Sequence, residues 1–243
     1  MHFLTVVVVT LSKAHLAPKI FALKFRHYGD IVVGEERDGH GMKKGDLSMN
    51  ASFISQQDRI LVMAIELISE SGLSALTLKG LANKGNIQEA VIYKHFGGID
   101  EVLIAVVEFF VKFDRSIMDT LRLKDSDTHN KILDFFDAYA TYYGNYKEIS
   151  AVILHYEELL HNIGTRELIA QCIEERSRFL TGLIQEGIDA GELKADMAAA
   201  DLADALISIM NGMIQSRRVM YHEEDLKQQL MKVVNQILEW AAQ

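Results

Sequence analysis

The chain has 243 residues, of which 49% are hydrophobic and 24% charged, a composition typical of a folded globular protein with one or two domains. Its formal net charge of -9 argues against a protein that binds nucleic acid through general positive charge, because phosphate affinity comes mainly from Lys and Arg. The single proline, Pro18, leaves the rest of the chain without the residue that most reliably breaks helices, so the sequence predicts an all-α fold.

Two features of the sequence indicate a cellular location. No segment approaches the roughly 18 to 20 consecutive apolar residues that a membrane span needs, so we expect no membrane association. The one cysteine, Cys172, cannot form an internal disulfide, which favours a reducing cytoplasm, and we expect it to be a small buried hydrophobic residue.

The first part of the chain differs from the rest. Residues 3–11 form a short apolar run, but no basic segment precedes it and no A-x-A-like cleavage site follows it, so a secretory signal is disfavoured. We interpret residues 1–54 as an atypical N-terminal extension. One hypothesis is a mis-assigned start, with translation beginning at Met49 or Met42.

The apolar spacing becomes helical after Ser55, whose S-x-x-D pattern predicts an N-cap, and the first helix continues to Gly72. Thr77 is a good N-cap for a short second helix, which ends in a predicted tight turn with positive φ at residues 84–86. A third helix follows at residues 87–95. Three short helices with a turn between the second and third predict a helix-turn-helix.

The rest of the chain continues the helical period between glycine breaks, and its last two helices are strongly amphipathic. The further helices are predicted at residues 100–123, 128–146, 147–161, 165–190, 197–221 and 224–242.

A helix-turn-helix presents its third helix to the major groove of DNA, with the N-terminal residues facing base edges. Gln88 is suited to reading adenine, Glu89 to accepting from cytosine, and Lys94 to anchoring a phosphate. The predicted DNA-contacting residues are Thr77, Lys79, Gln88, Glu89, Ala90, Tyr93, Lys94 and His95.

The segment from Ile60 to Val106 resembles the DNA-binding region of the TetR/AcrR family of transcriptional regulators over its whole length. The most specific similarities are the Gly72-x4-Thr77 spacing, the pair Leu81-Ala82, and Tyr93-Lys94-His95-Phe96 at the end of the third helix. Residues 182–213 also resemble the C-terminal regulatory domain of the family, with less specific motifs.

This resemblance implies a homodimer that pairs through its last two helices and binds a palindromic double-stranded DNA operator. It further implies a repressor that a small apolar or amphipathic ligand releases from the operator. Residues 55–103 would form the DNA-binding domain, and residues 104–243 the ligand-binding and dimerisation domain.

Two departures from the family pattern weaken the predicted DNA contacts. The chain has Gly85-Asn86-Ile87-Gln88 where the family usually has Ala-Gly-Val-Ser, so a hydroxyl cap and phosphate donor is lost at Gln88. Ile99 stands where the family usually has a lysine. From Asp58 to Glu101, four basic residues stand against six acidic ones, a net charge of -2. The alternative function is therefore a helical small-molecule-binding or partner-regulating protein that has lost operator binding.

Aromatic residues on two successive predicted helices suggest an apolar ligand pocket, although ordinary core and interface packing is the more common reason for such a group. Arg217, Arg218 and His222 either meet an anionic group of the ligand or only complement a helix end. The candidate pocket residues are Phe110, Phe113, Ile117, Phe136, Tyr139, Tyr143, His155, Phe179, Met210 and Ile214.

A carboxylate-bridged metal site is a third alternative, because Glu158 and His161 have the i, i+3 spacing found in such helical bundles. Such sites need two copies of the motif, and we find no second one in the sequence. No nucleophile elbow, P-loop or dinucleotide-binding motif is present. We therefore expect no enzyme activity, no metal and no cofactor.

Overall fold

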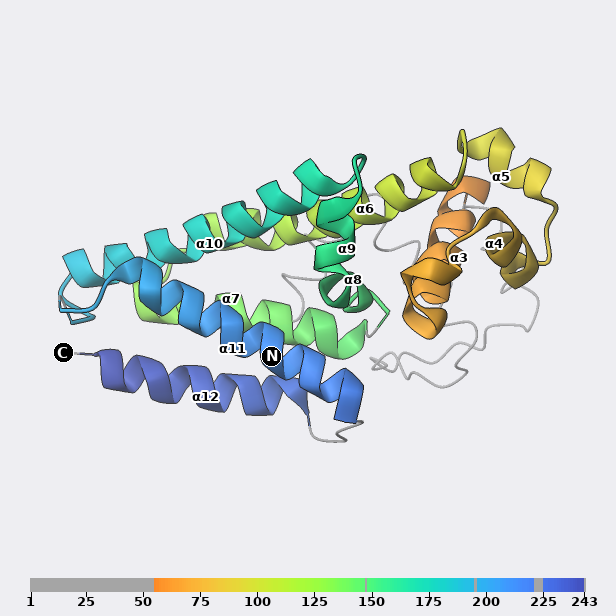
Figure 1. The fold of residues 1–243 in the computed structure, drawn as a ribbon. Coiled ribbons are helices and arrows are strands. Elements are labelled where there is room, and N and C mark those ends of the chain that lie inside the picture. The colour runs from red at the N-terminus through yellow and green to blue at the C-terminus, as the bar shows by residue number, and fades with distance from the viewer. Residues whose placement is uncertain (1–54, 147, 195, 221–224, 243) are drawn as a thin grey trace, which may run out of the picture.

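The computed structural model describes residues 55–146, 148–194, 196–220 and 225–242 (Figure 1). The hypotheses about residues 1–54 and about His222 lie outside these ranges. The described residues contain helices and no β-strand, in agreement with the predicted all-α fold. The helices are α3 (Gln56–Ser71), the 3-10 helix η2 (Leu73–Ala75), α4 (Leu78–Gly85), α5 (Glu89–His95), α6 (Ile99–Arg122), α7 (Thr128–Asn145), α8 (Ala151–Leu154), α9 (Tyr156–His161), α10 (Arg166–Asp189), α11 (Ala199–Met220) and α12 (Leu226–Ala241).

Helix α3 begins and ends where its capping residues predict. The Ser55 Oγ accepts a hydrogen bond from the Asp58 N–H at 3.1 Å, which satisfies one of the free donors of the first turn. Ile60 and Ile68, two helical turns apart, are buried on the side that faces the core. The helix stops at Gly72, whose φ of 82° favours a residue without a side chain.

Helices α4 and α5 form the turn that the sequence predicts. The Thr77 Oγ1 accepts a hydrogen bond from the Gly80 N–H at 2.9 Å, so Thr77 is the N-cap of α4. Asn86 has a φ of 48°, in the left-handed region that asparagine tolerates better than most residues. Helix α5 begins two residues later than Ile87, and its N-cap, Gln88, makes no side-chain capping hydrogen bond.

Helix α6 connects the N-terminal helices to the C-terminal bundle without a break (Figure 1). Its 24 residues give it a length of about 36 Å at about 1.5 Å per residue. Near its start it packs against α3, and further along it packs against α7 and α10. A displacement of α6 within the bundle would therefore be passed to α3, and through α3 to α4 and α5, which pack against it.

The C-terminal helices form a layered bundle. Helices α6 and α10 lie on one side, α7 and α11 in the middle and α12 on the opposite side, and α10 packs against α11 while α12 packs against α7 (Figure 1). Leu226, Leu230, Val234 and Leu238 form the buried stripe of α12, in agreement with its predicted amphipathic pattern.

The single helix predicted over residues 147–161 is wrong. The structure has a turn at residues 148–150 followed by two short helices, α8 and α9, which are separated at His155. All four consecutive residues at 149–152 are buried, whereas one regular helix on a bundle surface buries only a stripe. Because the helix is broken, α8 packs against α3 and α11 while α9 packs against α10.

Candidate functional site

Helix α5 is anchored by apolar residues and exposes its predicted DNA-contacting side. Ile92 is fully buried and Phe96 is 6% exposed, whereas Tyr93 is 53% exposed despite its large aromatic ring. His95 is half-buried. The other predicted contact residues are exposed or half-buried on α4, on α5 or at their N-caps: Thr77, Lys79, Gln88, Glu89, Ala90 and Lys94.

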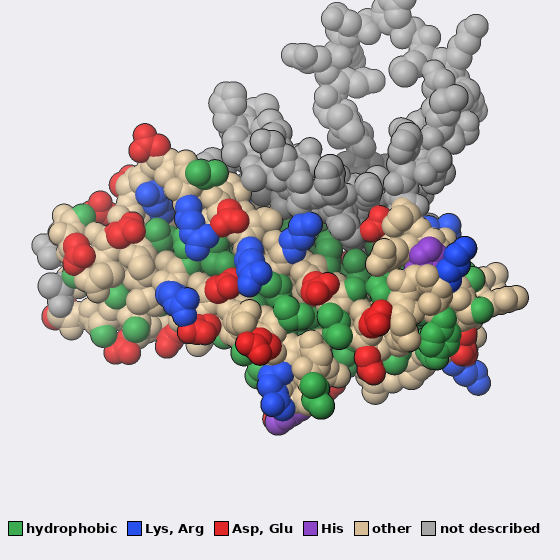
Figure 2. Space-filling view, turned by 90° about the horizontal axis from the view of Figure 1, so that it is seen from above, with side chains coloured by type: hydrophobic (Ala, Val, Ile, Leu, Met, Phe, Trp, Pro, Cys, Tyr) green, Lys and Arg blue, Asp and Glu red, His purple; other side chains and the backbone are tan. Residues whose placement is uncertain are grey.

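The positive charge available on this surface is small. The Lys84 Nζ lies 2.8 Å from Glu70 Oε2 and 3.5 Å from Glu66 Oε2, both on α3. Burial disfavours the charge of Lys84, but the two carboxylates raise its pKa, so the side chain is a cation held within the protein. Lys79 and Lys94 make no ion pair within the described residues. In Figure 2 the end of the molecule that carries α4 and α5 shows acidic and basic side chains close together.

The start of α6 offers a hydrogen-bond donor but no cation. The Gly97 N–H donates to the Glu101 Oε2 at 2.6 Å, so a carboxylate occupies this donor. Ile99, where the family resemblance would place a lysine, is half-buried and packs against the core.

Arg218, near the end of α11, joins three separate segments. Its Nη1 donates to the Ser150 Oγ at 3.1 Å, and its Nη2 donates to the Ser69 backbone oxygen at 3.2 Å and to the Ser69 Oγ at 3.3 Å. Ser69 lies on α3 and Ser150 directly precedes α8. This guanidinium therefore connects the end of α11 to α3 of the helix-turn-helix. It is a second link between the bundle and the helix-turn-helix, in addition to α6.

Eight of the ten candidate ligand residues belong to the buried core. His155 and Phe179 are half-buried. The buried candidates are Phe110, Phe113, Ile117, Phe136, Tyr139, Tyr143, Met210 and Ile214. Within this set, Tyr139 stacks against Tyr143 with centroids 6.1 Å apart, and Phe113 stacks against the neighbouring Tyr142 at 3.5 Å.

A buried ion pair lies among these rings. The Arg176 Nη2 is 2.5 Å from the Asp114 Oδ1, and both side chains are 2% exposed. The Tyr139 hydroxyl donates to the same Asp114 oxygen at 2.8 Å, and the Cys172 thiol lies 3.5 Å from Asp114 Oδ2. The Arg176 guanidinium also stacks 4.9 Å from the centroid of the Tyr139 ring. Burial opposes the charge of Arg176, but the neighbouring Asp114 raises its pKa well above the ordinary value.

Sequence reasoning missed both members of this pair, although each leaves a signal. Asp114 stands between Phe110 and Ile117 on the apolar stripe of α6, and Arg176 stands between Cys172 and Leu180 on that of α10. A charged residue within an apolar stripe predicts a buried partner, because an unpaired buried charge is very costly.

Several tyrosine hydroxyls in this cluster have no acceptor for their O–H among the described residues: those of Tyr142 and Tyr143, and that of Tyr156, whose oxygen accepts from Arg176. Burial raises the pKa of Tyr142 and Tyr143 well above the ordinary value and that of Tyr156 to about 12. All three are therefore protonated donors at neutral pH. Buried polar groups are normally paired with protein or water, so each of these donors requires an acceptor that the described residues do not supply.

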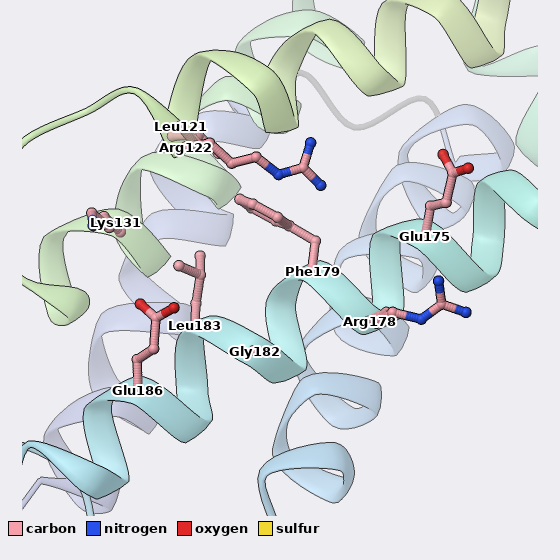
Figure 3. Close-up of a pocket in the computed structure, with 9 residues that line it drawn as sticks. All are labelled: Leu121, Arg122, Lys131, Glu175, Arg178, Phe179, Gly182, Leu183 and Glu186. Carbon is pink, nitrogen blue, oxygen red and sulfur yellow. The ribbon is translucent and has the colours of Figure 1, made fainter.

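A surface pocket of about 370 Å³ lies between the end of α6, the start of α7 and α10 (Figure 3). Its apolar part includes Phe179, over which the Arg122 guanidinium lies 5.1 Å from the ring centroid. The side chains and backbone that line the pocket belong to Leu121, Arg122, Lys131, Glu175, Arg178, Phe179, Gly182, Leu183 and Glu186. The pocket thus combines an apolar wall with charged groups of both signs.

The proposed metal motif does not form a ligand cluster in the described ranges. The His155 Nδ1 lies 3.3 Å from Glu158 Oε1, which is a hydrogen-bond geometry. No group of three His, Cys, Asp or Glu side chains in the described part of the chain is placed to hold a metal ion. None of the described helices is long and apolar enough to cross a membrane.

Two protein-family profiles match the chain. Residues 60–106 match the family of bacterial regulatory proteins of the tetR type, and residues 161–233 match the tetracyclin repressor-like C-terminal domain. The first match covers the helix-turn-helix of α3 to α5 and the start of α6. The second covers α10, α11 and part of α12.

Individual relatives agree with these profiles. The fatty acid metabolism regulator protein of Bacillus subtilis (strain 168) is 22% identical over 182 residues, which are 74% of this chain and 91% of that protein. The TetR family regulator PfmR from Thermus thermophilus has a TM-score of 0.66 at 21% identity, covering 74% of this chain and 97% of that one. FadR from Bacillus subtilis, solved in complex with stearoyl-CoA, has a TM-score of 0.58 at 19% identity, covering 76% and 96%.

The tetR-type profile falls on the helix-turn-helix whose α5 surface is exposed, and the C-terminal profile falls on α10, which carries Arg176 and Phe179, on α11 and on part of α12. Regulators of this kind bind operator DNA and small ligands, and they function as dimers. The chain therefore belongs to the TetR family and is a ligand-responsive, DNA-binding transcriptional regulator.

Proposed function

We propose that this protein is a homodimeric repressor that binds a palindromic operator through the exposed surface of α4 and α5. The observation that carries this proposal is the geometry of α5, which buries Ile92 and exposes Tyr93 and Lys94 at the end of the molecule. The proposed contact residues are Thr77, Lys79, Gln88, Glu89, Ala90, Tyr93, Lys94 and His95. Because Lys84 is held by Glu66 and Glu70, base contacts and a few phosphate contacts must supply the affinity.

Residues 55–103 are the proposed DNA-binding domain, and residues 104–243 the proposed regulatory domain. Helix α6 starts in the first and continues into the second, where it carries Phe110, Phe113 and Ile117. A ligand that rearranges these residues would move α6 and with it α3, against which α6 packs. In a dimer this motion changes the spacing of the two α5 helices, and a mismatch with the operator releases the DNA.

The proposed ligand is an apolar or amphipathic molecule of the fatty-acyl class. The aromatic cluster between α6, α7 and α10 supplies mostly apolar contacts with few polar groups, as ligand sites do. Fatty acid metabolism regulators are among the relatives, and one of them was solved with stearoyl-CoA. The surface pocket beside Phe179 offers cations, such as Arg122 and Lys131, for a polar part of such a ligand.

The proposed dimer interface is formed by α11 and α12. Their buried stripes face α10 and α7, yet Ile209, Met213, Val233 and Ile237 are not fully buried, and Trp240 is 67% exposed. Pairing of two copies would remove this apolar surface from water. A protein that acts on operator DNA works in the cytoplasm, which is the location we propose.

The experiment that tests the proposal is a selection from random duplex DNA, followed by binding of the enriched sequence over a range of salt concentrations. We expect a palindrome, with affinity that falls as salt rises. The double variant Tyr93→Ala/Lys94→Ala should keep its helical content and lose operator affinity at least ~10-fold, the loss expected when a base contact and a phosphate contact are both removed. Failure to enrich any sequence at low salt would favour a small-molecule-binding protein without an operator, in keeping with the small positive charge of α4 and α5.

A further inference from the structure

The buried polar cluster in the C-terminal bundle is balanced in charge but not in hydrogen bonds. Arg176 and Asp114 neutralise each other at 2.5 Å, and Tyr139 donates its hydroxyl to Asp114. The Tyr143 hydroxyl has no partner among the described residues, although its side chain is only 3% exposed, and the Tyr156 oxygen accepts only from Arg176, so neither O–H has an acceptor there. The cluster therefore has no net charge but contains hydrogen-bond donors without an acceptor.

Tyr143 and Tyr156 lie near the same guanidinium. The Phe110 ring contacts both Arg176 and Tyr156, and the Tyr139 ring contacts both Arg176 and Tyr143. Tyr143 comes from α7, Tyr156 from α9 and Arg176 from α10, while Asp114 is on α6. The ring of Phe110 packs edge-on against Tyr156 at 6.2 Å between centroids, so apolar surface adjoins the donors. A ligand bound beside these side chains would contact α6, α7, α9 and α10.

We propose that Tyr143 and Tyr156 recognise an uncharged carbonyl oxygen, such as that of an ester or thioester, on an otherwise apolar ligand. This inference rests on the proposed ligand site and specifies the chemistry that the site accepts. Two phenol donors leave unmet hydrogen bonds that an acceptor oxygen satisfies. A carboxylate is disfavoured, because it would bring a second negative charge beside Asp114, where the buried cation Arg176 is already neutralised.

The test compares ligands that share one chain length and differ in the polar group. The probes are methyl dodecanoate, dodecanoyl-CoA, dodecanoate and dodecane, with dissociation constants measured by calorimetry or by competition. We expect the wild-type protein to bind the ester at least ~10-fold more tightly than dodecanoate or dodecane. Dodecane lacks the hydrogen bonds to the two phenols, and dodecanoate brings a charge that the site disfavours. Dodecanoyl-CoA shows whether a thioester with a large polar group reaches the same site.

Tyr143→Phe and Tyr156→Phe are the decisive variants, and Tyr146→Phe on the same helix as Tyr143 is the matched control. Each decisive variant should weaken ester binding by about 5- to 10-fold and leave dodecane binding unchanged. The melting temperature of Tyr143→Phe should equal or exceed that of the wild type, because the change removes an unpaired buried hydroxyl. Tyr156→Phe also loses an acceptor for Arg176, so its melting temperature should fall slightly. The control should bind the ester as the wild type does.

Three results would overturn the inference: dodecanoate binding as tightly as the ester, wild-type ester affinity in both phenylalanine variants, or no binding of any probe. The second result would mean that the hydroxyls only hold water molecules. Operator binding measured on the same wild-type preparation judges the proposed repressor function separately, since it requires no ligand.

Discussion

Two ion pairs join α6 to α10: Asp114–Arg176, which is buried, and Arg115–Glu175, which is partly exposed. Breaking each pair and comparing the losses in unfolding free energy measures how burial changes the cost. In Asp114→Asn the guanidinium of Arg176 stays 2% exposed and loses its only carboxylate partner in the described structure. Removing one partner of a buried ion pair costs about 3–5 kcal/mol, since the remaining charge is left uncompensated. We expect a loss of that size in the free energy of unfolding, which lowers the melting temperature by roughly 10 °C for a chain of this length.

The control is Arg115→Gln. Arg115 and Glu175 are joined at 2.7 Å on the same two helices, but their side chains are 47% and 34% exposed. An exposed pair of this kind contributes at most about 1 kcal/mol. Urea unfolding of both variants at one fixed protein concentration gives the comparison, because dimer stability depends on concentration.

A double variant separates the pair's own contribution from the cost of an orphaned charge. In Asp114→Leu/Arg176→Met both charges are absent, and stability should return to within about 2 kcal/mol of the wild type. If Asp114→Asn were no more destabilising than Arg115→Gln, the conclusion that Arg176 depends on Asp114 in a water-free environment would be refuted.

Three further outcomes follow from single contacts. Thr77→Ala removes the hydroxyl that caps α4 at Gly80 and should cost about 1 kcal/mol in urea unfolding, whereas Thr77→Ser should cost little. Burial raises the pKa of the Cys172 thiol to about 12, so iodoacetamide at pH 8 should label native protein at least ~100-fold more slowly than unfolded protein; equal rates would contradict its burial. Arg218→Lys cannot hold Ser69 as a planar guanidinium does, and operator selection with this variant should accept a wider range of half-site spacings; an unchanged range would argue against this link.

Much of the fold could be predicted because helix ends are encoded locally. Ser55, Gly72, Thr77 and Asn86 act through contacts within a few residues, and α3, α4 and the turn before α5 begin and end where these residues predict. The amphipathic stripe of α12 likewise predicted its buried side, since a helix of period 3.6 has one face toward the core.

The break at His155 and the pairing inside the bundle depended on tertiary structure. Whether residues 149–152 continue a helix is decided by the shape of the space they fill, which several other helices define. Asp114 and Arg176 are 62 residues apart, and nothing local in either helix indicates the other.

The sequence by itself determined the helical class, the helix-turn-helix and the family, because capping, periodicity and short motifs act over a few residues. Only the tertiary structure decided that Lys84 is held by Glu70, that Arg218 reaches Ser69, and that the tyrosines surround an ion pair. These arrangements arise from the packing of distant helices, where a charge or hydroxyl acquires its role from neighbours that sequence distance does not reveal.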